Sequence, residues 1–211
     1  AYIGEYMERA RKAQAIINTY TQEQVDRLCS VIAYEMTRPE MEAELATLAL
    51  EETELGDYDS KVAKIEKKVK GMFMEIKHEK TVGIVEEIPE RGMRRIKKPV
   101  GVIGSLIPST QPEMIPITTA MCTVKSRNAV IMAPHPRGKK TTYQTVEKMR
   151  ELLRKNGAPA DILQCVDLVK VAVTNELMRQ ADLVIATGGA GMVKAAYSSG
   201  TPAYGVGAGN A

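Results

Sequence analysis

"ADLVIATGGAGMVKAAYSSG", residues 181–200, is the stretch that decides the fold. It begins with a short apolar run, passes through glycines at 188, 189 and 191, and continues with residues that favour a helix. An apolar strand that leads through a flexible loop into a helix is half of a βαβ unit. We therefore predict a strand over 181–187 and a helix over 191–199.

The same alternation extends over the second half of the chain. Apolar runs occupy residues 100–107, 128–134, 161–166, 181–187 and 202–207, and helical segments occupy 113–127, 139–156, 175–180 and 191–199. Runs that are apolar on both faces suit strands that are covered on both sides, which indicates a parallel sheet of about five strands. Right-handed crossovers then bring the carboxyl ends of all the strands to one edge.

The first half of the chain has a different pattern. Helical periodicity covers residues 2–36, where Thr21 and Gln24 have the spacing of a capping box that begins a second helix. Further helices are predicted over 41–53 and 61–74, and two extended segments joined at 90–92 predict a β-hairpin. The predicted fold class is therefore α/β: a Rossmann-like parallel sheet with helices on both faces, preceded by N-terminal helices and a β-hairpin.

Composition argues against several classes of protein. The 211 residues are 44% hydrophobic and 26% charged, which is ordinary for a globular protein. The net charge is only +3, basic and acidic residues alternate along most of the chain, and aromatic residues are scarce. We therefore expect no nucleic-acid partner. No apolar run reaches the roughly 18–20 residues of a membrane span, so we expect no membrane partner.

Cysteine and histidine usage bears on metals and on location. Cys29, Cys122 and Cys165 are far apart, and His78 and His135 have no neighbouring ligand residues, so no metal site is predicted. An odd number of cysteines without a signal peptide favours a reducing cytoplasm. Each cysteine lies in a predicted helix or strand and is expected to be a small buried hydrophobic residue rather than a nucleophile.

Three loops that follow strands should meet at the carboxyl edge of the sheet, where open α/β sheets bind ligands. They are residues 107–112, 133–140 and 187–191. The glycine loop either lets backbone N–H groups approach a phosphate or is a tight turn that needs positive φ, and the residues alone favour neither. It departs from the standard dinucleotide fingerprint, because Lys194 occupies the third glycine position. The cations Lys139 and Lys140 begin a predicted helix, where their charges oppose the helix dipole. Their placement there therefore requires an explanation.

Four motifs carry a resemblance to a known family. They read EETELGDYDSKVAKIEKKV (51–69), PVGVIGSLIPSTQP (99–112), KSRNAVIMAPHPRGKKTT (125–142) and ATGGAGMVKAAYSSGTPAYGVGAGN (186–210). Together they resemble the CoA-acylating branch of the aldehyde dehydrogenase superfamily, which contains acetaldehyde, succinate-semialdehyde and sulfoacetaldehyde dehydrogenases. The resemblance covers essentially the whole chain.

This resemblance implies an activity for the intact enzyme. A small aldehyde is oxidised with NAD or NADP through a thiohemiacetal on a catalytic cysteine, and coenzyme A then attacks the resulting thioester to give acyl-CoA. The resemblance also implies a homodimer or homotetramer. The cytoplasm is the expected location, and placement in a bacterial microcompartment stays open.

The resemblance divides the chain into three parts. Residues 1–80 would form the N-terminal helical segment of the cofactor domain, 81–98 a hairpin of the oligomerisation type, and 99–211 the NAD(P)-binding Rossmann-like region. The nucleophilic cysteine of the family belongs to a catalytic domain beyond these residues. We therefore assign no catalytic residue within the chain, expect both of its ends to lie inside a longer protein, and predict that the chain alone is inactive.

The resemblance also implies a set of cofactor-binding residues. Those on the nicotinamide side are Ile107, Pro108, Ser109 and Thr110; those at the adenosine part are His135, Pro136 and Arg137; those at the pyrophosphate are Thr187, Gly188, Gly189 and Val193; and Gly157 and Pro159 would flank the adenine. Arg137, Lys139 and Lys140 either meet a 2′-phosphate or face solvent, so NAD and NADP both stay open.

Two features of the sequence bear on the chemistry. Members of the superfamily that hydrolyse the thioester carry a glutamate base where this chain reads GVGAGN over 205–210. The missing carboxylate fits attack by the CoA thiolate, which needs no activated water. Relatives often have asparagine where Gln111 stands, so the aldehyde pocket is expected to differ.

Two alternatives remain at this point. One is a non-catalytic nucleotide-binding or scaffold module that has the same fold. The other is a phosphorylating enzyme like glutamyl-phosphate reductase, against which the HPR (135–137) and AAYSSG (195–200) motifs argue.

Overall fold

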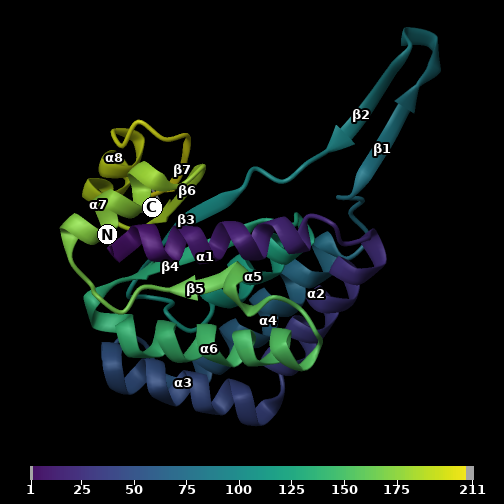
Figure 1. The fold of residues 1–211 in the computed structure, drawn as a ribbon. Coiled ribbons are helices and arrows are strands. Elements are labelled where there is room, and N and C mark those ends of the chain that lie inside the picture. The colour runs from purple at the N-terminus through teal and green to yellow at the C-terminus, as the bar shows by residue number, and fades with distance from the viewer. Residues whose placement is uncertain (1, 208–211) are drawn as a thin grey trace.

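A computed structural model describes residues 2–207 of the chain and shows a parallel sheet at its centre (Figure 1). The five strands are β3 (Val102–Ile107), β4 (Ala129–Pro134), β5 (Leu163–Cys165), β6 (Leu183–Thr187) and β7 (Ala203–Val206). They pair in parallel in the order β5-β4-β3-β6-β7. Every residue of β3 and β4 is buried, as expected for strands covered on both faces. The predicted fold class is confirmed.

The direction of winding reverses at β3. The helices that connect the strands are α5 (Ile115–Lys125), α6 (Lys139–Lys155), α7 (Val171–Gln180) and α8 (Ala190–Tyr197). The chain moves from β3 through β4 to β5 in one direction, and then returns to the other side of β3 for β6 and β7. With right-handed crossovers, α5 and α6 cover one face of the sheet, and α7 and α8 cover the other. A reversal of this kind opens a crevice at the carboxyl ends of the strands.

The N-terminal helices complete both faces. They are α1 (Tyr2–Ile17), α2 (Gln22–Met36), α3 (Pro39–Thr53) and α4 (Tyr58–Ile76). Helix α1 packs on β3, β4 and α7, whereas α2, α3 and α4 pack on α5 and α6. Figure 1 shows α1 lying across the sheet and α3 below α6. The capping box of Thr21 and Gln24 is present and begins α2, as predicted. Within residues 2–207, no helix combines the length and the apolar character needed to cross a bilayer.

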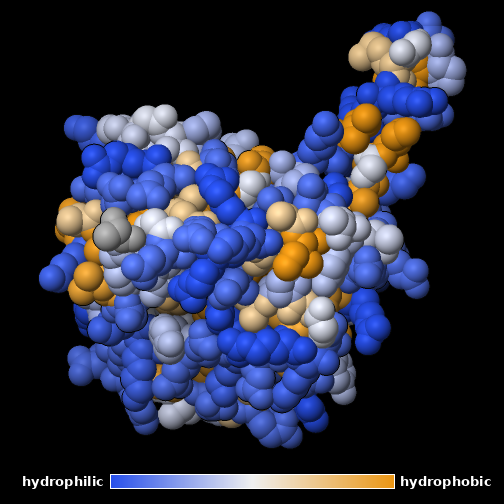
Figure 2. All heavy atoms as spheres, in the orientation of Figure 1, coloured by the Kyte–Doolittle hydropathy of each residue, from blue (hydrophilic) through white to orange (hydrophobic). Residues whose placement is uncertain are grey.

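The predicted hairpin projects from this body (Figure 1). Strands β1 (Gly83–Ile88) and β2 (Met93–Lys97) pair antiparallel, and Gly92 closes the turn at a φ of 59°, in the left-handed region that favours glycine. Figure 2 shows hydrophobic and hydrophilic residues side by side along the arm. Ile84, Met93 and Ile96 are exposed. The hairpin therefore presents both of its faces to the surroundings.

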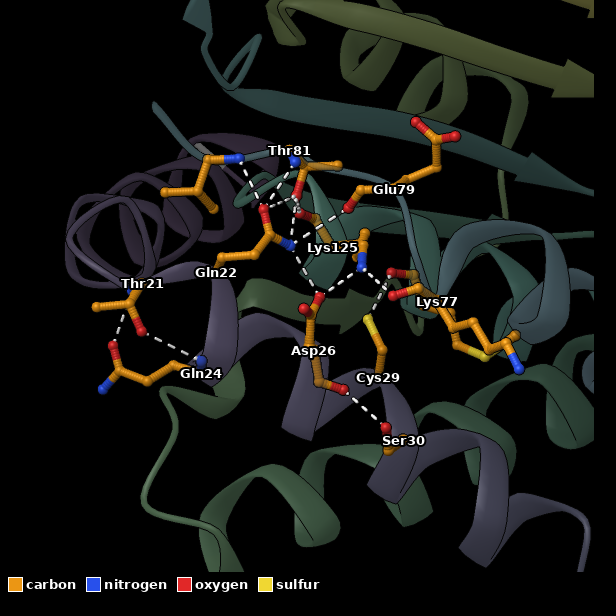
Figure 3. Close-up of polar contacts among 12 residues, drawn as sticks. Thr21, Gln22, Gln24, Asp26, Cys29, Ser30, Lys77, Glu79, Thr81 and Lys125 are labelled. Atoms are coloured by element: carbon orange, nitrogen blue, oxygen red, sulfur yellow. Dashed lines mark hydrogen bonds and ion pairs between the residues drawn. The ribbon is translucent and has the colours of Figure 1, made fainter. Parts of the chain in front are cut away.

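A polar network fixes the root of the hairpin to the helices (Figure 3). Lys125, which ends α5, is almost fully buried; its ammonium pairs with Asp26 of α2 and donates to the carbonyl of Lys77 at 3.1 Å. The side-chain oxygen of Gln22 accepts the backbone N–H of Thr81 at 2.8 Å, and its NH2 group donates to Asp26 at 2.8 Å. The Thr81 hydroxyl donates to the Lys125 carbonyl at 2.6 Å. Helices α2 and α5 thereby hold the segment that enters the hairpin.

The network predicts the effect of Asp26→Asn. This change removes the one carboxylate that pairs with the buried Lys125 ammonium within residues 2–207. We expect the free energy of unfolding to fall by about 3 kcal/mol, the low end for a broken buried pair, because Asp26 itself is partly exposed. Urea denaturation measures the change. Glu66→Gln, which breaks the exposed pair with Lys70, is the control and should leave the midpoint unchanged. Equal losses in the two variants would contradict this account.

Candidate functional site

A cleft of about 560 Å³ lies at the carboxyl edge of the sheet, between the strand ends and helices α7 and α8. Its volume is within the range of small-molecule sites. It is lined by Leu106, Ile107, Ala133, Pro134, His135, Pro136, Val169, Lys170, Val171, Thr174, Asn175, Met178, Gly191, Met192 and Ala195. Most of these side chains are apolar, and the lining contains one lysine, one histidine and no carboxylate.

The glycine loop borders this cleft and is not a turn that needs positive φ. None of Gly188, Gly189 and Gly191 has a positive φ, so that alternative is wrong. A Cβ added at Gly189 or Gly191 would meet no atom of residues 2–207 within 4 Å. Neither backbone strain nor packing among these residues therefore requires glycine at the two positions. Their open space suits the close approach of a ligand.

The start of α8 also offers hydrogen-bond donors. Gly189 is the N-cap residue and has no side chain to cap the helix. Within residues 2–207, the backbone N–H groups of Gly189, Ala190 and Gly191 have no protein acceptor. Unpaired N–H groups and the positive end of the helix dipole make such a terminus a site for a phosphate.

The start of α6, at the same edge, is closed by a carboxylate of the protein. Glu52 of α3 accepts the backbone N–H of Lys140 and the backbone N–H and hydroxyl of Thr141, each at 2.7 Å. A carboxylate at a helix N-terminus satisfies free donors and complements the dipole. This contact explains how Lys139 and Lys140 are tolerated at this helix start. It also leaves the starts of α7 and α8 as the uncapped helix termini beside the cleft.

Hydrogen bonds and packing fix the position of the loop after β4. The Arg137 guanidinium donates to the carbonyl of Thr53 at 2.7 Å, and the backbone N–H of Arg137 donates to Nδ1 of His135 at 3.1 Å. A Cβ at Gly138 would lie 2.7 Å from Cβ of Pro112, so glycine is required there for the two loops to touch. The loops after β3 and β4 are thus packed against each other, and His135 is held at the cleft.

The structure brings together only part of the predicted cofactor set. Ile107, His135 and Pro136 line the cleft. Five more residues lie at or just after strand ends at the same edge without lining the cleft: Pro108, Ser109, Thr110, Thr187 and Gly188. Gly189 is the N-cap of α8, beside the cleft. Arg137 is turned toward α3, and Val193 packs toward Gly205 of β7, where a Cβ would lie 2.5 Å from its Cγ1 atom.

Gly157 and Pro159 lie away from the cleft. Helix α6 leaves the carboxyl edge at Lys139 and runs back along the sheet, so the residues after it lie at the opposite edge. The carbonyl of Gly157 accepts a hydrogen bond from Tyr20, which follows α1, at 3.4 Å. Neither residue lines the cleft, so their place beside an adenine gains no support from it and stays a prediction.

One segment of the cleft was missed by sequence reasoning. Val169, Lys170 and Val171 follow the third predicted strand, at the same edge as the other loops. The rule that gave the other loops applies here too, but β5 has only three residues and the predicted helix began late, at residue 175. Thr174 and Met178, on the helix itself, complete this wall.

The cysteines are only partly where the sequence placed them. Cys29 and Cys165 are buried, as expected, and burial raises the pKa of the Cys29 thiol to about 12. Cys122 was expected to be buried but is exposed, although its thiol lies 3.8 Å from the sulfur of Met72 on α4. None of the three lines the cleft. Within residues 2–207, no cluster of His, Cys, Asp and Glu could hold a metal ion.

The fold is a doubly wound α/β sheet with a cleft at its carboxyl edge, and comparison with known proteins identifies the family. The model of the aldehyde dehydrogenase family matches residues 1–203. The chain belongs to the aldehyde dehydrogenase family.

Two curated relatives and one solved structure are close to the chain. It is 48% identical over 209 residues to the acetylating succinate-semialdehyde dehydrogenase of Clostridium kluyveri, covering 99% of this chain and 46% of that protein. It is 47% identical over 205 residues to the sulfoacetaldehyde dehydrogenase of an Acholeplasma species, covering 97% and 42%. The crystal structure of an acetylating aldehyde dehydrogenase from Geobacillus thermoglucosidasius has a TM-score of 0.95 at 40% identity, covering 99% and 46%. The chain thus spans less than half the length of the relatives.

The contact between Glu52 and α6 predicts the effect of Glu52→Gln. The amide keeps the shape of the side chain but loses the charge at the helix start, and one acceptor oxygen becomes a donor. We expect the free energy of unfolding to fall by about 1 kcal/mol, and hydrogen exchange at Lys140 and Thr141 to become at least tenfold faster.

Glu44→Gln is the matched control, because Glu44 also lies on α3 and pairs with α6, through Lys148 at 2.7 Å, but away from the helix start. Its exchange at Lys140 and Thr141 should equal that of the wild type. Unchanged protection of these two amides in Glu52→Gln would show that the carboxylate does not cap the helix.

Proposed function

We propose that this chain is the NAD(P)-binding part of a CoA-acylating aldehyde dehydrogenase. The intact enzyme would catalyse aldehyde + CoA + NAD(P)+ → acyl-CoA + NAD(P)H + H+. The substrate is a small aldehyde, and coenzyme A is the acyl acceptor. Family membership and the two acetylating relatives support this choice of branch. The division of the chain at residues 80 and 98 remains part of this proposal.

The observation that carries the proposal is the open start of α8. Two glycines face empty space at a helix N-terminus whose first N–H groups have no acceptor within residues 2–207. The pyrophosphate of a dinucleotide accepts hydrogen bonds from backbone N–H groups of this kind. Glycines let it approach the backbone closely. The cleft beside it is apolar and large enough for a nucleoside.

Different residues of the chain would bind different parts of the dinucleotide. The N–H groups at Gly189–Gly191 would donate to the pyrophosphate, and the apolar side chains of Met178 and Met192 would enclose the adenosine part. The strand end at Ile107, with the loop that follows it, would direct the nicotinamide toward the substrate. When bound, NAD(P)+ supplies the hydride acceptor.

The nucleophile is proposed to be none of the three cysteines described above, since none lines the cleft. Cys29 is further disfavoured by its raised thiol pKa, because the thiolate is the reactive form. Residues 205–207 contain no carboxylate that could activate water, whereas 208–210 of the same motif lie outside the described residues. Deacylation by the CoA thiolate is therefore kept as the proposal.

Assembly and location are also parts of the proposal. The exposed hairpin, with Ile84, Met93 and Ile96 unburied, fits a contact between copies in a homodimer or homotetramer. The three free cysteines fit a reducing cytoplasm. Neither the scaffold alternative nor the phosphorylating one gains a supporting observation, because the two relatives and the solved structure are described as dehydrogenases and two of them as acetylating.

Gly191→Ala tests the proposal by separating stability from binding. Ala favours a helix over Gly, so the free energy of unfolding should stay equal or rise by up to about 1 kcal/mol. The added methyl would occupy the space next to the pyrophosphate, and the affinity for NAD+ or NADP+ should fall at least tenfold. Calorimetric titration and urea denaturation measure the two quantities.

Gly71→Ala is the matched control, since Gly71 lies within α4 and a Cβ there also meets nothing within 4 Å. It should gain stability and bind the dinucleotide like the wild type. If Gly191→Ala binds as tightly as Gly71→Ala, the glycine does not face the ligand and the proposed site is wrong.

A further inference from the structure

The cofactor preference is the feature of this cleft that the sequence left open. We propose that the ammonium of Lys170 binds the 2′-phosphate of NADP+, so that this cleft selects NADP+ over NAD+. The inference rests on the proposed function, since it assumes that the cleft binds a nicotinamide dinucleotide. It follows from the charges around the cleft, taken one group at a time.

The cations that the sequence suggested for a 2′-phosphate are placed elsewhere. The Arg137 guanidinium donates to the carbonyl of Thr53 on α3. Lys139 and Lys140 begin α6, beside the Glu52 carboxylate that caps that helix. None of these three residues lines the cleft.

Lys170 is the lysine that does line it. It is exposed, it occupies the N-cap position of α7, and it has no ion-pair partner within residues 2–207. Its ammonium is therefore available to a ligand phosphate. A lysine binds phosphate as a point charge and does not need the bidentate geometry of an arginine.

The segment that carries Lys170 is held in place. The Tyr2 hydroxyl accepts the backbone N–H groups of Asp167 and Leu168 at 3.2 and 3.1 Å, and itself donates to the Asp167 carboxylate. This carboxylate is therefore already engaged by α1. Glu176, further along α7, is engaged by Arg179 at 2.9 Å and by Gln180 at 2.6 Å. Both neighbouring acids are thus occupied within the protein.

The absence of a carboxylate from the lining of the cleft also favours NADP+ over NAD+. Sites that prefer NAD+ hold the ribose hydroxyls with an acidic side chain, whose charge also repels a 2′-phosphate. No Asp or Glu lines this cleft. A phosphorylated ribose would therefore meet one cation and no anion, whereas an unphosphorylated ribose would gain nothing from Lys170.

The test is calorimetric titration of the wild-type chain, Lys170→Gln and Lys68→Gln with NADP+ and NAD+ separately. Lys68 is an exposed lysine on α4 and serves as the matched control. The wild type should bind NADP+ about tenfold more tightly than NAD+, the scale of one charged hydrogen bond, and salt should reduce the difference. Lys170→Gln should lose this preference through weaker NADP+ binding alone, and Lys68→Gln should keep it.

The possible failures are distinguishable. A folded wild-type chain that binds neither nucleotide would contradict the proposed function. Binding of both with NAD+ equal or tighter would overturn the inference and leave the proposed function standing. A loss of NAD+ and NADP+ affinity by the same factor in Lys170→Gln would overturn it as well, because the lysine would then act on a group that both nucleotides share.

Discussion

The reversal of winding at β3 is the constraint on which the rest of this structure depends. Strand β3 pairs in parallel with β4 on one side and with β6 on the other, so the crossover helices on its two sides cover opposite faces of the sheet. The helices on the far side of the reversal cannot cover the carboxyl ends of β3 and β4. That uncovered edge becomes the cleft, and its apolar floor is supplied by the buried strands themselves, at Leu106 and Ala133.

The N-terminal helices contribute to the site although they do not line it. Helix α3 ends in Glu52 and Thr53, which cap α6 and hold Arg137. Lys61 of α4 forms a buried ion pair at 3.3 Å with Glu113, which lies just after the loop that follows β3. The geometry of the two loops after β3 and β4 is therefore determined partly by residues 52 to 89 positions earlier in the chain. A segment that reads as plain amphipathic helix is in this sense part of the cofactor site.

Local patterns in the sequence were enough to predict the fold. Apolar runs, a capping box and turn residues are local signals, and each of the predicted strands, the helices and the hairpin is present with small shifts in its bounds. The edge rule also placed the loops that include Ile107, His135 and Gly189 at the site. Contacts between segments that are far apart in the sequence could not be predicted from these local signals. Nothing near Glu52 shows that it caps α6, and nothing near Gly157 shows that α6 carries it to the far edge of the sheet.

Amide chemical shifts would test the central claim most directly, namely that the edge opened by the reversal at β3 is a dinucleotide site. The measurement is titration of the isotope-labelled chain with NADP+, followed by heteronuclear NMR. The account predicts saturable shifts concentrated at Gly189–Met192, His135 and Lys170–Asn175, with the hairpin and its root unchanged. Saturable shifts centred on the groove at the opposite edge, around Asn18 and Arg127, or no shifts in a chain shown to be folded, would contradict it.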